Sequence, residues 1–157
     1  MAYEVEFQDA ELKKFLSKLS EKLQQVKDGE RKYTALLSSV VFRDIIQHFE
    51  QEQGSEGKWQ EWSASYRQHM EEIGKSGNKI LQFTGKLRNN FKPQNVKRVR
   101  EGLMWFNDAK TKTGFPYAFA HNEGGSVLPK RDFMWLSDKA IDDIEKNTIA
   151  FMNEKES

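Results

Sequence analysis

The sequence predicts an α+β fold, in which N-terminal helices pack with a small antiparallel sheet containing a central β-hairpin and a C-terminal helix follows. Three observations favour this class. Apolar residues recur at helical spacing in the N-terminal half, β-branched and aromatic residues flank a Glu-Gly pair at 101–102, and helical spacing returns after Ser137. Strands and helices do not alternate, so the pattern does not predict a parallel sheet.

The 157 residues are expected to form a single domain, 1–157, because this length can bury one core. Its parts are a helical region at about 8–74, a hairpin-containing region at about 80–136 and a helix at about 137–153. A short strand is predicted at residues 3–7 (YEVEF), where apolar and acidic side chains alternate.

Three helices are predicted in the N-terminal half, at about 9–26, 31–53 and 63–73. The first has its apolar stripe at Leu12, Leu16, Leu19, Leu23 and Val26. This spacing also fits a coiled-coil seam, but it lasts little more than two heptads, which favours packing on the second helix. The second helix has its stripe at Leu37, Val41, Ile45 and Phe49, widened by Leu36, Val40 and Ile46.

The third helix is expected to carry Tyr66, Met70 and Ile73, with Ser63 or Ser65 as its N-cap. Trp59 and Trp62 just before it fit either an anchor packed on the domain or a surface for a partner, and packing is favoured.

The second half of the chain predicts a brief helix from Thr84, as its cap, to about Phe91. The hairpin is expected to pair residues 95–100 with 103–107, and the polar loop at 108–116 is expected to be exposed. The last helix should be capped by Ser137 and bury Ile141, Ile144, Thr148 and Phe151.

Composition narrows the classes of function. With 25 basic and 24 acidic residues the net charge is +1, so no global field favours nucleic acid, a membrane or an acidic partner. The absence of cysteine excludes a disulfide framework and thiolate metal sites, and fits a reducing cytosol. We expect neither a membrane span nor a signal peptide, because no stretch has the required apolar length or basic start.

No set of residues predicts an enzyme, a cofactor or a metal site. The histidines have no partner at helical metal-binding spacing, and the pair His121 and Glu123 is weak evidence for a cation. The chain lacks a Gly-x-Ser-x-Gly elbow and a phosphate-binding glycine loop.

A basic stretch permits two interpretations. Lys97, Arg98 and Arg100 lie near Trp105 and Phe106, as in a surface that contacts a DNA backbone. The same charges on a solvated strand would discourage edge-to-edge pairing.

The order of the remaining motifs carries a resemblance. Trp59 in a helical half is followed by Leu81-x-x-Thr84-Gly85-x-Leu87, a hairpin, Tyr117-Ala118-x-x-His121-x-x-Gly124-Gly125 and Leu128-Pro129-x-Arg131-x-Phe133. Over about residues 5–150 this order resembles the phage virion morphogenesis family, whose members are tail-completion proteins similar to the Mu G-like and P2 S-like proteins. The loop at 108–114 has no counterpart in that pattern.

The resemblance implies a structural virion protein and not an enzyme. Such a protein acts in tail completion or head–tail joining, and its partners would be further copies of itself in a ring, phage tail and neck proteins and weakly held DNA of any sequence. It would be found in the host bacterial cytoplasm during assembly and then in the virion tail or neck.

The residue types of the motif suit defined structural roles. Gly85 allows close backbone approach, Leu87 should pack inward, and Gly124 and Gly125 should form a turn that Pro129 stiffens. We expect interface contacts from aromatic and cationic side chains of the hairpin, the loop and the last motif, namely Trp105, Phe106, Lys110, Lys112, Arg131, Phe133 and Trp135. For Arg131 and Phe133, packing within the chain is an equally weighted alternative.

Overall fold

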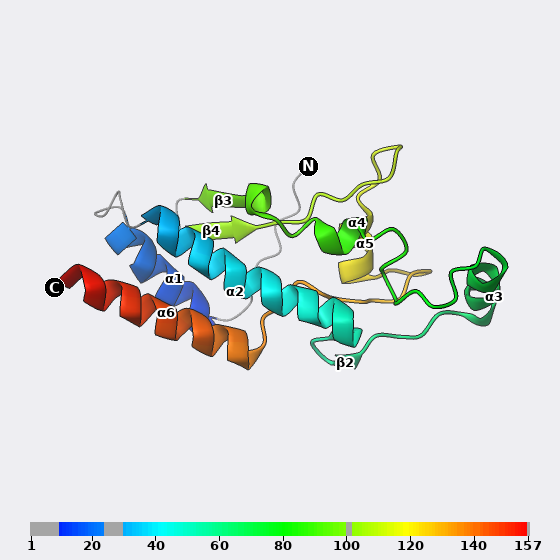
Figure 1. Ribbon diagram of the computed structural model, residues 1–157, viewed down its shortest axis with the longest axis horizontal. Helices are drawn as coiled ribbons and strands as arrows, with labels where there is room; N and C mark the ends of the chain where they lie inside the picture. Colours follow the sequence, from blue (N-terminus) through cyan, green and yellow to red (C-terminus); the bar gives the residue numbers. More distant parts are fainter. Residues whose placement is uncertain (1–9, 24–29, 100–101, 157) are drawn as a thin grey trace. The chain divides into compact units, whose positions relative to one another are not determined.

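A computed structural model describes residues 10–23, 30–99 and 102–156 (Figure 1). The predicted strand at 3–7 and Arg100 lie outside the described residues. The elements in chain order are α1 (Ala10–Leu23), α2 (Glu30–Gln51), β1 (Gln53–Gly54), β2 (Gly57–Lys58), α3 (Ala64–Glu72), α4 (Lys86–Asn89), the 3-10 helix η1 (Pro93–Asn95), β3 (Val96–Val99), β4 (Gly102–Trp105), α5 (Tyr117–Glu123) and α6 (Asp138–Glu156). The α+β class is therefore confirmed. In the described ranges, no helix is both long and apolar enough to cross a membrane.

The chain divides into two compact units. Unit 1 contains Ile45–Phe91 and Asn107–Trp135, and unit 2 contains the described residues within Ala2–Asp44, Lys92–Phe106 and Leu136–Ser157. Helix α2 contributes its residues up to Asp44 to unit 2 and its last turns to unit 1. The expected single domain over 1–157 stays a prediction.

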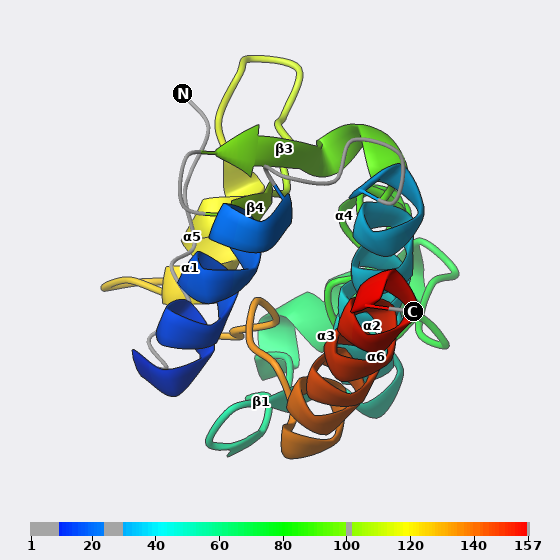
Figure 2. The same cartoon turned by 90° about the vertical axis from the view of Figure 1, so that its left-hand side faces the viewer.

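In unit 2, α6 runs antiparallel to the first part of α2, as Figures 1 and 2 both show. Near the start of α2, the Tyr33 ring stacks on Phe151 with ring centroids 4.5 Å apart, and the Tyr33 hydroxyl is hydrogen-bonded to that of Thr148. Further along α2, the Asp44 carboxylate accepts hydrogen bonds from Ser137 N at 2.8 Å and from Ser137 Oγ at 2.5 Å. These contacts fix both the direction and the register of the two helices.

The hairpin of unit 2 is the one that the sequence predicts. Strands β3 and β4 are antiparallel, with Val96 opposite Trp105 and Val99 opposite Gly102. Trp105 is buried and its indole Nε1 donates to Ser38 Oγ at 3.1 Å, while Lys97 Nζ lies 5.0 Å from the centroid of the Phe106 ring. The aromatic end of the hairpin is thus packed inside unit 2, because the indole finds its polar partner on α2.

An aromatic cluster forms the core of unit 1. Phe49, at the end of the predicted α2 stripe, lies 5.5 Å from the Trp59 ring and 5.1 Å from the Phe133 ring, and Phe91 lies 6.0 Å from Phe133. Trp59 Nε1 donates to Asp132 O at 2.9 Å. Trp59 is therefore a packing anchor, the favoured of its two interpretations.

Some predicted positions differ from the structure. Leu36, Tyr66 and Ile73 are about two-fifths exposed, at 41%, 42% and 41%. The buried face of α2 is narrower than its apolar pattern, and α3 buries Met70 while its flanks meet solvent. Ser63 does cap α3, accepting from Tyr66 N at 3.3 Å.

Two short helices also differ from expectation. Helix α4 begins after Gly85, which is its N-cap at φ 73°, and Thr84 is not the N-cap. The left-handed backbone at position 85 favours glycine, and Thr84 Oγ1 only accepts a 3.4 Å bond from Lys86 N. Helix α5 is absent from the sequence prediction, because Pro116 and Gly124 bound a segment of only 7 residues and are themselves typical of turns.

Candidate binding pocket

A pocket of about 820 Å³ opens in unit 1. Three stretches of chain line it: residues 60–70 around the start of α3, residues 79–87 and residues 110–131. The lining includes eight residues of the motif that the sequence singled out, Leu81, Thr84, Leu87, Tyr117, His121, Leu128, Pro129 and Arg131. It also includes Lys110 and Lys112 of the polar loop. We call this site the unit 1 pocket.

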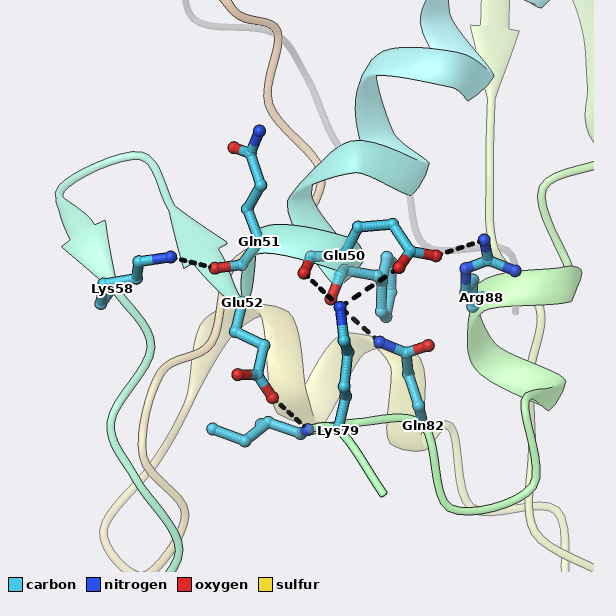
Figure 3. A network of polar contacts seen from close by, with 9 residues as sticks. Glu50, Gln51, Glu52, Lys58, Lys79, Gln82 and Arg88 are labelled. Carbon is cyan, nitrogen blue, oxygen red and sulfur yellow. Dashed lines mark hydrogen bonds and ion pairs between the residues drawn. The ribbon is translucent and has the colours of Figure 1, made fainter. Parts of the chain in front are cut away.

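The stretch at 79–87 is held by the C-terminal end of α2, where the last carbonyls of a helix lack partners within the helix (Figure 3). Gln82 Nε2 donates to Phe49 O at 2.9 Å and Lys79 Nζ donates to Glu50 O at 2.6 Å. Donors from an adjacent stretch thus complete the helix end, and the positive charge of Lys79 suits its negative pole.

Carboxylates at the same end of α2 add to this attachment. Arg88 Nη2 contacts Glu50 Oε1 at 2.5 Å, and the hydrogen bond from Lys79 is the main cause of the lowered pKa of Glu50. Glu52 Oε1 accepts from Ile80 N at 2.6 Å. Hydrogen bonds and ion pairs therefore attach both ends of the 79–88 stretch to the C-terminal end of α2. They fix the position of this wall of the pocket.

Leu81 lies in this wall with φ at 61°, in the left-handed region that L-residues other than glycine rarely adopt. Leu87, four residues after Phe83, is buried as expected. A residue keeps such a strained backbone conformation only where the surrounding structure holds it in place.

The third stretch is shaped by Gly124. This residue ends α5 at φ 73°, and a β-carbon there would lie 2.7 Å from Lys130 N. Behind it, Gly125 N donates to Leu128 O and Arg131 N donates to His121 O, each at 2.8 Å. The chain therefore folds back along α5, as the Gly-Gly motif predicts.

Arg131 is the buried charge of the pocket. Its side chain is 7% exposed, and Nε and Nη2 donate to Gln60 O at 3.0 and 2.9 Å. Nη2 also approaches Glu61 O at 3.4 Å. Burial lowers the pKa of Arg131, yet a guanidinium stays protonated in proteins. Because the bonded oxygens are neutral carbonyls, the positive charge persists at the pocket.

The surroundings of His121 favour its neutral form. Burial, and then the nearby charge of Arg131, lower its pKa below the usual 6.5. Its Nδ1 is buried and has no hydrogen-bond partner among the described residues. Burial also raises the pKa of Tyr117, which lies four residues earlier on α5.

Lysines give the pocket a positive balance. Lys86, Lys110 and Lys112 are exposed, and in the described part of the chain their ammonium groups make no hydrogen bond or ion pair. The other charged groups in the lining differ, because Lys79 pairs with Glu50 at 3.3 Å and Glu61 with Arg67 at 3.6 Å.

Other predicted site residues lie elsewhere. Phe133 is fully buried in the aromatic core, Ala118 is buried, and Trp135 stacks on His48 with ring centroids 3.8 Å apart. Lys97 and Arg98 are exposed on β3 in unit 2. The interface role proposed for Trp105, Phe106, Phe133 and Trp135 stays a prediction, although the first three are buried within their own units.

Sequence reasoning missed two polar residues that support the pocket. Asn122 Oδ1 accepts from the backbone N of Phe133 and of Met134, each at 3.0 Å. Asp132 Oδ2 accepts from Ser55 Oγ at 2.5 Å. Neither belongs to a recognisable motif, since each acts on backbone or side-chain groups distant in sequence.

Comparisons with known proteins add no relative: no family model, no curated protein and no solved structure matches this chain. Among the described residues, no group of three or more His, Cys, Asp or Glu side chains is placed to hold a metal ion.

Proposed function

We propose that the chain is a structural protein of phage or prophage virion morphogenesis, acting in tail completion or head–tail joining. It would act by self-association and by docking on tail or neck components. One observation carries the proposal: residues of the motif that are spread from Leu81 to Arg131 line a single pocket. Phe133 differs from them, because it lies in the aromatic core.

The chemistry of the unit 1 pocket supports recognition. Its free charges are cations, and it exposes aromatic surface at Tyr66 and Phe83. Cationic and aromatic side chains of this kind commonly anchor protein partners.

The direct test is made in the phage or prophage that encodes the chain. Interrupting its reading frame should leave filled heads and separate tails in electron micrographs, and a wild-type copy in trans should restore joined virions. Normal virions from the interrupted phage would contradict the proposal. Deleting residues 110–114 tests the contribution of the loop, because two of the exposed lysines of the pocket, Lys110 and Lys112, lie there.

The exposed cations of β3 favour a second candidate function, that of a nucleic-acid-binding module. Lys97 and Arg98 are neighbours on β3 and are both exposed. This function predicts binding to duplex DNA that weakens steeply as salt rises and is lost when Lys97, Arg98 and Arg100 are changed to alanine. Binding that survives these substitutions would exclude β3 as the DNA contact.

A further inference from the structure

We infer that the unit 1 pocket binds an acidic, extended segment of a partner protein. Carboxylates of the segment would lie over Lys86, Lys110 and Lys112, and its apolar side chains would cover exposed apolar groups of the lining. The inference rests on the proposed function for one point, that the partner is a tail or neck component. Binding itself can be measured without that assumption.

Charge complementarity is the first argument. The two other charged groups exposed in the lining, Lys79 and Glu61, have ion-pair partners, whereas Lys86, Lys110 and Lys112 have none in the described ranges. Arg131 adds a buried positive charge. The whole chain has a net charge of only +1, so this concentration of cations is local and favours an anionic partner at this site.

Exposed apolar surface is the second argument. Tyr66, Phe83 and Val127 line the pocket and are 42%, 44% and 95% exposed. A free phosphate would meet the lysines and leave this surface in water. A peptide in which acidic and apolar side chains alternate would satisfy the cations and bury the apolar groups together.

The third argument is that the backbone around the pocket is fixed while the cations are not. The left-handed backbone at Leu81 and Gly124, and the bonds from Arg131 to Gln60 O, define the conformation of this backbone without a ligand. The lysines can adjust their long side chains to a carboxylate. We therefore expect salt-sensitive binding that is specific for charge and for apolar content.

The test uses the full-length protein and fluorescein-labelled peptides in an anisotropy titration. The panel contains nonapeptides that alternate glutamate with phenylalanine or valine, in two registers. Matched peptides replace every glutamate by glutamine, or every apolar residue by serine. We expect the acidic apolar peptides to bind at least about tenfold more tightly than either matched set, a readily measured difference in affinity.

Variants assign the binding to the pocket. The triple variant Lys86→Glu, Lys110→Glu, Lys112→Glu should lose at least about tenfold in affinity, while the corresponding triple arginine variant should keep it. A matched control reverses three exposed lysines of unit 2, Lys14, Lys18 and Lys32. Both glutamate triples change the net charge equally, so only a local site separates them.

Several outcomes would overturn the inference. Equal binding by the two glutamate triples would place the contact outside the pocket. Competition by inorganic phosphate, with no preference for the apolar peptides, would make the occupant a small anion. Failure of every peptide to bind at about 1 mM would exclude a peptide site of useful affinity. If the peptides fail and the pocket triple instead abolishes a wild-type oligomer in light scattering, the occupant is a second copy of this chain.

The two proposals fail separately. Normal virions after interruption of the gene, with peptide binding lost in the pocket triple, would refute the proposed function and leave the pocket inference intact. Unjoined tails in the interrupted phage, with full rescue by the pocket triple, would do the reverse.

Discussion

The two units of the molecule use the chain in different ways. Unit 2 is built from long helices and a hairpin, with polar groups such as Trp105 Nε1 paired across them. Unit 1 is built from the last turns of α2, the short β1–β2 pair, short helices and connecting segments. Among the described residues, every residue with positive φ except Gly102 lies in unit 1. Periodic packing therefore defines unit 2, whereas special backbone positions define the unit that holds the pocket.

The largest effect is expected from the core of unit 1. Changing Phe133 to alanine empties a fully buried site beside Phe49 and Phe91, and should lower the free energy of unfolding by about 3–5 kcal/mol. Denaturant titration measures it. Phe115, at 56% exposed, is the matched control, and its alanine variant should change stability by less than about 0.5 kcal/mol. Similar losses for both variants would contradict the core assigned to unit 1.

Two adjacent glycines test whether special backbone positions define unit 1. Changing Gly124 to alanine places a β-carbon 2.7 Å from Lys130 N at a φ of 73°, and should cost about 2 kcal/mol or more. Gly125 has open space around its α-carbon, so its alanine variant should lie within about 0.5 kcal/mol of wild type. Thermal and denaturant unfolding compare the two. Equal losses of stability in the two variants would contradict the role assigned to the left-handed backbone at Gly124.

In unit 2 a smaller effect is expected at the start of α6. Ser137 Oγ accepts from Ala140 N at 3.2 Å and donates to Asp44. Its change to alanine should cost about 1–2 kcal/mol, because a capping bond is lost and a buried carboxylate loses a donor. Ser39, exposed on α2, is the control, and its alanine variant should be close to neutral. A neutral Ser137 variant would show that packing alone fixes α6.

The smallest effect is a pH dependence specific to unit 1. Burial and Arg131 lower the pKa of His121 in the folded chain, so the unfolded chain binds this proton more readily. The free energy of unfolding should therefore fall as the pH drops below 6.5 toward the folded-state pKa. Below pH 6.5 the free energy of unfolding, measured by denaturant titrations at a series of pH values, should depend less steeply on pH in the variant His121→Gln than in the wild type. An unchanged slope would assign the pH dependence to other groups.

The sequence predicts unit 2 better than it predicts unit 1. The stripe Leu37, Val41, Ile45 and Phe49 is fully buried as predicted, and the hairpin pairs as expected, because period and turn composition are local signals. Leu36 was predicted to be buried and is exposed, since the width of a buried face depends on its neighbours.

For the candidate site, the sequence singled out some of the lining residues but not their arrangement. The motif contains Tyr117, His121 and Arg131, yet nothing in it shows that they line one pocket with Lys86. Their placement depends on contacts distant in sequence, such as Arg131 with Gln60 O and Asn122 with Phe133 N. Helix α5 was missed for a related reason, because its bounding proline and glycine indicate a turn when read alone.

The most direct test of the division of roles is a nitrogen–proton NMR titration of the full-length protein with an acidic apolar nonapeptide. The account predicts that shifted amide signals cluster at residues 60–70, 79–87 and 110–131, the three stretches that line the unit 1 pocket. Shifts centred on Lys97 and Arg98 of β3, or the same shifts in the pocket triple variant, would contradict it.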